Sequence, residues 1–209
     1  MRVYVETNFI LEMALDQEDH ASCEEILDLA DQRKLVLVLP AFSLTEASQT
    51  LERRHEARAK LVADGEVGRE LRQLQRSKPF HDKTKTVRDE IEVLFNESGE
   101  RAQKNLQVLN ARLLSIASIL PLGAAVIKKV ENCPFRDIKV FDAIVLFSIL
   151  ADRADSSREP EQRCFLSSDG KAFDDPDIRE ALTAHNCKFF KRFPDAIRYI
   201  RSQVAGSSA

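Results

Sequence analysis

Residues 35–39 form an unbroken apolar run, Leu-Val-Leu-Val-Leu, which Pro40 closes. A run of this length without polar alternation predicts a strand that is buried on both faces, as in a parallel sheet between two layers of helices. Residues 2–5, 163–167 and 187–190 are further short apolar segments with the length of strands. Segments with helical periodicity separate these strands, so the sequence predicts an α/β protein with a central parallel sheet.

Helical patterns fill most of the remaining chain. The predicted helices cover residues 9–14, 17–31, 123–131, 138–151, 176–182 and 194–204, and another begins at about residue 42. Charge is dense over residues 52–76, and a second long helical pattern runs over residues 87–120 with a break at Ser98 and Gly99. We therefore expect a helical arm inserted at about residues 52–120.

The predicted domain organisation is a single domain of residues 1–204 that carries this arm. Residues 156–161 are expected to form a polar loop, and residues 205–209 a disordered tail. The chain of 209 residues is 44% hydrophobic, which is enough for a core. Its net charge of −3 restricts any basic surface to a local patch.

Several other function classes are disfavoured by the sequence. The longest apolar stretch, residues 116–127, contains Pro121 and Gly123 and is too short to cross a bilayer. The start of the chain has no signal-peptide pattern, so a cytoplasmic location without membrane contact is expected. The four Cys show no CxxC pair and the four His no HExxH spacing. We expect free buried thiols and packing or surface imidazoles, and neither a zinc site nor a disulfide framework.

Acidic residues follow the predicted strands. Glu6 and Asp169 each come just after a strand, and Glu46 lies in the first turns of the helix after residues 35–39. The carboxyl ends of parallel strands meet at one edge of the sheet, where open α/β proteins place their functional crevice. These three carboxylates can therefore face the same crevice. The alternative for each acid alone is a turn residue or a helix cap.

Asp142 lies within an apolar helical segment. Its helical neighbours Ile138, Val145 and Leu146 are all apolar. An unpaired carboxylate in that setting lowers stability or shifts its pKa, so it needs a base, a helix N-terminus or a metal as partner. An ion pair with Lys139 or with an arginine elsewhere is the alternative to a metal site.

Glu6, Glu46, Asp142 and Asp169 come from four segments that can converge on the carboxyl edge of the sheet. Four carboxylates repel one another unless cations neutralise their charge. Oxygen ligands without His or Cys favour Mg²⁺ or Mn²⁺ over Zn²⁺. Two such ions about 4 Å apart can activate water and stabilise the leaving oxygen of a phosphodiester. The set therefore predicts a metal site with nuclease chemistry.

Four short motifs around these acids resemble those of the PIN domain. The motifs are Glu6-Thr7-Asn8 after the first strand, Leu44-Thr45-Glu46-Ala47, Phe141-Asp142-Ala143-Ile144, and residues 165–176 around Asp169. The resemblance covers roughly residues 1–50 and 137–195. It implies a PIN-like three-layer α/β/α fold with a central parallel sheet, to which this chain adds a helical arm.

The resemblance also implies an activity. It indicates an endoribonuclease dependent on Mg²⁺ or Mn²⁺, of a toxin type or an RNA-processing type, with Glu6, Glu46, Asp142 and Asp169 as the catalytic metal ligands. RNA is then the expected substrate, and a protein antitoxin or a second copy of the chain the expected protein partner. Two features depart from the family's pattern. Glu6 stands where the usual residue is Asp, and the arm is longer than in the small toxin-type members.

Other polar residues near the expected site have two interpretations. Asp174 could add a metal ligand, whereas Asp175 is expected to cap the following helix. Thr7 and Asn8 either orient a water or a carboxylate around the metal or cap the helix that follows them.

Basic residues are candidates for binding phosphates. Lys139, Lys171 and Arg136 lie near the predicted site and are expected to contact substrate phosphates. The arm adds many more, interleaved with glutamates, as either a solvated helix face or a phosphate-tracking wall. These arm residues are Arg53, Arg54, Arg58, Lys60, Arg69, Arg72, Arg76, Lys78, Lys83 and Lys85. With no Trp and 2 Tyr, the sequence shows no aromatic platform for bases.

Two alternative functions differ in class. The first is a non-catalytic RNA-binding or scaffold protein that kept the fold while Glu6 altered the metal geometry. The second is a phosphoaspartyl phosphatase, which requires a nucleophilic Asp and a second Asp two residues later. Glu6 and Asn8 occupy those positions here, which disfavours the phosphatase.

Overall fold

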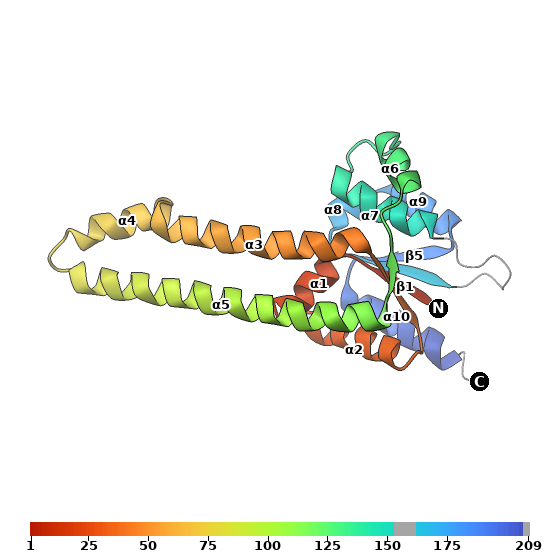
Figure 1. Ribbon diagram of the computed structural model, residues 1–209, viewed down its shortest axis with the longest axis horizontal. Helices are drawn as coiled ribbons and strands as arrows, with labels where there is room; N and C mark the ends of the chain where they lie inside the picture. The colour runs from red at the N-terminus through yellow and green to blue at the C-terminus, as the bar shows by residue number, and fades with distance from the viewer. Residues whose placement is uncertain (153–161, 207–209) are drawn as a thin grey trace.

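The computed structural model describes residues 1–152 and 162–206, and it shows a five-stranded parallel sheet between helices (Figure 1). The strands are β1 (Arg2–Val5), β2 (Val36–Pro40), β3 (Ser118–Leu120), β4 (Arg163–Leu166) and β5 (Cys187–Phe190). Their order across the sheet is β3-β2-β1-β4-β5, with parallel pairing between neighbours. The predicted three-layer α/β/α fold is confirmed.

Ten helices surround or extend from the sheet within the described residues. They are α1 (Thr7–Ala14), α2 (His20–Asp31), α3 (Ala41–Ala63), α4 (Glu66–Gln75), α5 (His81–Ile116), α6 (Ala124–Glu131), α7 (Val140–Ala151), α8 (Gly170–Phe173), α9 (Pro176–Ala184) and α10 (Phe193–Gly206). Helix α10 ends at Gly206, two residues into the range 205–209 for which a disordered tail is predicted. Residues 207–209 and the loop predicted at 156–161 lie outside the described residues.

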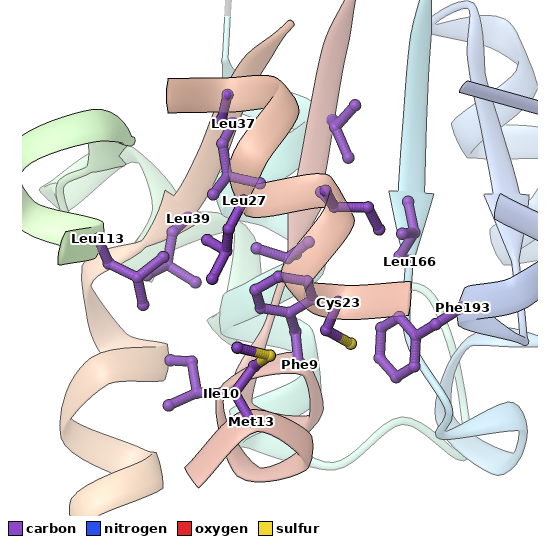
Figure 2. Close-up of a cluster of buried hydrophobic side chains, with 14 of the residues drawn as sticks. Phe9, Ile10, Met13, Cys23, Leu27, Leu37, Leu39, Leu113, Leu166 and Phe193 are labelled. Carbon is purple, nitrogen blue, oxygen red and sulfur yellow. The ribbon is translucent and has the colours of Figure 1, made fainter. Parts of the chain in front are cut away.

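The larger core lies on one face of the sheet. Strand side chains alternate between faces, so Val3 and Val5 point into this core. Buried side chains of α1, α2, α5 and α10 belong to the same cluster. Figure 2 shows Phe9, Leu113 and Phe193 of these helices within it. Phe9 and Phe193 meet edge to face, with ring centroids 5.9 Å apart. This cluster therefore ties the base of the long helix α5 to the sheet.

The second core covers the opposite face. Tyr4, which alternates with Val3 and Val5, packs here with Phe165 of β4. Leu146 of α7 and Leu182 of α9 cover these strand residues. Strands buried on both faces explain why the sequence shows unbroken apolar runs.

The arm consists of the outer parts of α3 and α5 with α4 between them, and it projects from the sheet as an antiparallel helix pair (Figure 1). Arg58 of α3 donates to Ser98 Oγ at 3.2 Å and lies over the ring of Phe95. The predicted helix break at Ser98 and Gly99 is wrong, since α5 runs through both. A Cβ at Gly99 would lie 3.0 Å from His55 Nδ1, so this glycine allows close packing of α5 on α3.

The arm ends earlier than the sequence predicts. Residues 118–120 were expected to be helical but form the edge strand β3, in which Leu39 pairs with Ile119. Periodicity cannot separate three apolar residues from the end of a long amphipathic helix. Pairing with β2 satisfies backbone groups of that strand and so decides the conformation.

The base of α5 is fixed to α2 by Arg112. Its guanidinium group forms ion pairs with Glu24, Asp28 and Asp31, the last two at 2.7 Å. Farther along α5, Asn105 Nδ2 donates to the carbonyl oxygen of Ala14 at 3.2 Å. These polar contacts set the direction in which the arm leaves the domain.

Candidate active site

The carboxyl edge of the sheet brings the sequence-predicted acids together. Glu6 follows the central strand β1, and Asp169 lies beyond its neighbour β4. Glu46 is in the second turn of α3, which starts directly after β2 on the other side of β1. Asp142 is in the first turn of α7, which packs on the same edge region. All four residues therefore lie at or beside this edge of the sheet.

Glu6 is the most buried of these acids, with 4% of its surface exposed. Its Oε2 accepts the backbone N–H of Asn8 at 2.9 Å, while its buried Oε1 has no hydrogen-bond partner among the described residues. The pKa of Glu6 is raised to about 8, mainly because burial disfavours the charge. The charges of Glu46 and Asp142 act in the same direction, against Asn8 and the Ser167 hydroxyl.

Thr7 orients Glu46 across the boundary between α1 and α3. Its hydroxyl donates to Glu46 Oε2. The N-cap of α1 is Glu6, whose side chain accepts from Asn8. The alternative that Thr7 and Asn8 cap this helix is therefore wrong, because Glu6 takes that place. Thr7 contacts a carboxylate of the site through its side chain, and Asn8 does so through its backbone.

Asp142 has no ion-pair partner within 4 Å in the part of the chain that the structure describes. Its pKa is raised to about 6, first by burial and then by the charges of Asp169 and Glu46. Lys139, at the N-cap of α7, lowers it but does not cancel these effects. Lys139 therefore acts on Asp142 through space without forming the ion pair that the alternative interpretation requires.

Asp169 is held by backbone groups. Its Oδ1 accepts the N–H groups of Lys171 and Ala172, both at 3.0 Å, which makes it the N-cap of α8. The Oγ of Ser167 accepts the N–H of Asp169 at 3.0 Å. The sequence did not predict α8, which has only 4 residues. The carboxylate is thus fixed by a short turn that leaves its second oxygen for other partners.

The four carboxylates influence one another electrostatically, but they do not form a closed cage. Within residues 1–152 and 162–206, no three Asp, Glu, His or Cys side chains lie close enough to hold a metal as they stand. The donor set nevertheless fits a hard divalent cation, since all its donors are oxygens and Glu6 presents a buried unpaired oxygen. A cation would also offset the charges of Glu46 and Asp142 that raise the pKa of Glu6, and the charges of Asp169 and Glu46 that raise the pKa of Asp142.

The two acids after α8 have other contacts. Asp174 forms ion pairs with Arg179 and, at 3.2 Å, with Lys191. These cations lower the pKa of Asp174 and already pair with its carboxylate. Asp175 caps α9, because its side chain accepts the N–H of Asp177 at 2.9 Å. That cap was predicted.

The cations predicted near the site are available to solvent. Lys139, Lys171 and Arg136 are all exposed. Sequence analysis missed Lys191, which follows β5 and lies against Gly170, beside Asp169. Its position after the last strand was the signal, because that strand ends at the same edge as β1 and β4.

The fold and this edge define the class: an α/β/α protein with an acidic site at the carboxyl ends of parallel strands. Within that class the chain belongs to the PIN domain family, because the family model matches residues 3–173. Members of this family are generally nucleases. No curated protein and no solved structure matches the chain significantly.

The matched range extends from β1 to the end of α8 and includes the whole arm. It stops before α9, β5 and α10, which complete the sheet and its helical layers. Among the helices of the described residues, none combines the length and apolar character that crossing a bilayer requires.

Proposed function

We propose that the chain is an endoribonuclease that requires Mg²⁺ or Mn²⁺ and binds the ion through Glu6, Glu46, Asp142 and Asp169. The observation that carries the proposal is the buried Glu6 carboxylate, with one oxygen unpaired and a pKa raised by burial and by neighbouring acids. A buried carboxylate at position 6 that bound nothing would make the fold less stable than an apolar residue at the same position. When bound, the ion would supply activation of water and stabilisation of the leaving oxygen.

Each protein group has a defined part in this proposal. The backbone N–H of Asn8 fixes one oxygen of Glu6, and the Thr7 hydroxyl fixes one oxygen of Glu46. Both carboxylates therefore approach a ligand with little freedom to rotate. Lys139, Lys171 and Arg136 would neutralise the phosphates on either side of the cleaved bond. No protein nucleophile is required.

The test is cleavage of a labelled single-stranded RNA by the full chain with Mg²⁺ or Mn²⁺, with and without EDTA. The Asp142→Asn variant is the control, because it removes one proposed ligand and a charge that the fold disfavours. We expect cleavage that EDTA and Asp142→Asn both abolish, with a melting temperature of the variant in EDTA that equals or exceeds that of the original chain. Equal cleavage in EDTA would contradict the metal mechanism.

A second candidate function is RNA binding without efficient cleavage, as in a scaffold protein. It is favoured by the contacts that Thr7 and the start of α8 already make to Glu46 and Asp169. RNA affinity without cleavage at any concentration of either ion would support it. An antitoxin, a second copy of the chain as partner and a cytoplasmic location stay predictions.

A further inference from the structure

Two phenylalanines meet at the rim of the acidic site. Phe42 is in the first turn of α3 and Phe141 in the first turn of α7, with ring centroids 5.1 Å apart at 45°. Phe42 lies about one helical turn before Glu46, and Phe141 directly precedes Asp142. The junction that brings the two carboxylates into electrostatic contact therefore also brings the rings together.

The pair has a buried support and an exposed surface. Phe42 is partly buried and packs against the core on the α7 side of the sheet. Phe141 is 48% exposed, and Val140 beside it is 62% exposed. Exposure alone does not set Phe141 apart, since Phe80 is equally exposed. What sets it apart is that the ring of Phe42 supports its ring at the junction of α3 and α7.

The surroundings indicate what covers Phe141. Asp142 directly follows Phe141, and the exposed Lys139 lies two residues before it. A phosphodiester chain that passes the acids with its phosphates near Lys139 has unpaired bases within reach of an aromatic face. Base stacking on aromatic side chains is a usual part of single-strand recognition. An apolar protein segment could also pack on the ring, but it would have no group that binds the adjacent charges.

We propose that Phe141, supported by Phe42, stacks on an unpaired base next to the cleaved phosphate of a single-stranded RNA. The inference rests on the proposed function and adds to it a residue that positions a base of the substrate. A base inside a duplex has both faces covered by its neighbours and cannot stack on the ring, so duplex RNA is excluded from this position. Phe141 then sets which phosphate reaches the carboxylates.

The first experiment compares kinetics of Phe141→Ala, Phe141→Trp and the control Phe80→Ala on one RNA of twelve nucleotides. Phe80 is 50% exposed, like Phe141, but it lies at the far end of the arm. We expect Phe141→Ala to lower kcat/KM by about 5- to 100-fold, the equivalent of one base stack. Phe141→Trp should retain or raise kcat/KM, and Phe80→Ala should leave it unchanged.

The second experiment locates the base. Single abasic positions are introduced along the same RNA. At one position close to the cleavage site, removal of the base should lower kcat/KM of the original chain by the same factor as Phe141→Ala does. When the abasic RNA and Phe141→Ala are combined, the two reductions in kcat/KM should not multiply. Losses that multiply at every position would contradict direct stacking.

The third experiment measures contact without cleavage. In the Asp169→Asn background, which keeps a capping side chain at α8, RNAs carrying 2-aminopurine at successive positions are titrated with protein. We expect quenching at one position, and its loss when Phe141→Ala is added. RNA binding without quenching at any position would contradict stacking on Phe141 and leave the ribonuclease proposal intact. Absence of both binding and cleavage by the original chain would instead contradict the ribonuclease proposal, and with it stacking on Phe141.

Discussion

Glu6 is a carboxylic acid that the fold withdraws from water. Its pKa is raised from 4.5 to about 8, so between these pH values the folded chain holds a proton that the unfolded chain has released. The free energy of unfolding therefore falls as the pH rises from about 4.5 to about 8. A cation bound to Glu6 would remove this dependence by replacing the proton.

The Glu6→Gln variant tests this dependence. In EDTA, we expect the free energy of unfolding of Glu6→Gln, relative to that of the original chain, to rise from pH 5 to pH 9. The expected rise is on the order of 1 to 3 kcal/mol. Urea unfolding at pH 5, 7 and 9 measures the difference, with Glu52→Gln on the exposed arm as control. Parallel pH profiles for Glu6→Gln and the original chain would show that Glu6 is ionised in the fold.

The length of the Glu6 side chain gives a second prediction. The PIN-like motif usually has Asp at this place, and Glu must fix one more rotatable bond to reach an ion, at a cost of roughly 0.5 kcal/mol. Mg²⁺ tolerates misplaced ligands poorly, whereas Mn²⁺ is more tolerant. The original chain should therefore prefer Mn²⁺, and Glu6→Asp should narrow the gap. Initial cleavage rates against the concentration of each ion measure this, and rates for Glu6→Gln equal to the original chain would exclude Glu6 as a ligand.

Among the elements, α5 makes polar contacts with α2 through Arg112. Arg112 contacts three carboxylates of α2 and is about a quarter exposed, whereas Arg101 has one partner, Asp16, and is 71% exposed. Partly buried networks stabilise more than single surface pairs. Because both arginines lie on α5, Arg101 serves as a control for Arg112.

We expect Arg112→Ala to lower the free energy of unfolding by roughly 1 to 2 kcal/mol, and Arg101→Ala by less than about 0.5 kcal/mol. Urea unfolding of the two variants measures both values. Because the network is ionic, the loss for Arg112→Ala should shrink at high salt. Equal losses for the two variants would show that the three carboxylates of α2 add nothing.

The elements also show what the sequence could predict. Strands β1 and β5 have the predicted boundaries, because short apolar runs between turns leave little choice. Strand β3 was missed because tertiary pairing with β2 decides its conformation. The break expected at Gly99 fails because the packing of that residue on His55 depends on a partner helix far away in the chain.

The candidate site, like the fold, could be predicted from the sequence only in part. The positions of Glu6 and Asp169 follow from the rule that parallel strands end at one edge. Asp142 was indicated by its apolar helical neighbours. The contact of Thr7 with Glu46, the cations on Asp174 and the pairing of Phe42 with Phe141 join segments that are distant in sequence. Such contacts depend on helix directions that periodicity does not specify.

At the scale of the whole molecule, the base of the arm is packed into the domain core. Leu106, Leu109 and Leu113 of α5 belong to the main core, whereas Val62 and Arg58 are packed within the arm itself. His55 of α3 and Gly99 of α5 lie opposite each other. A short loop can therefore join the two helices at this level.

We expect a chain in which residues 56–98 are replaced by a short Gly-Ser loop to fold, with a melting temperature within about 5 °C of the original, because closing a short loop costs little. Circular dichroism and thermal unfolding measure this. The same chain separates the two interpretations of the basic arm. Slower cleavage of a long RNA but not of a six-nucleotide RNA would support a phosphate-tracking wall, and equal rates a solvated face.

Helix α3 is one unbroken rod from Ala41 to Ala63, so Glu46 and the outer arm turn together. A rotation of this rod by about 20° would swing the Glu46 carboxylate by about 2 Å, since side-chain ends lie roughly 5 to 6 Å from a helix axis. Ligand geometry tolerates only about 0.5 Å. A rotation of the outer part of the arm would therefore displace the carboxylate of Glu46, which is a candidate metal ligand.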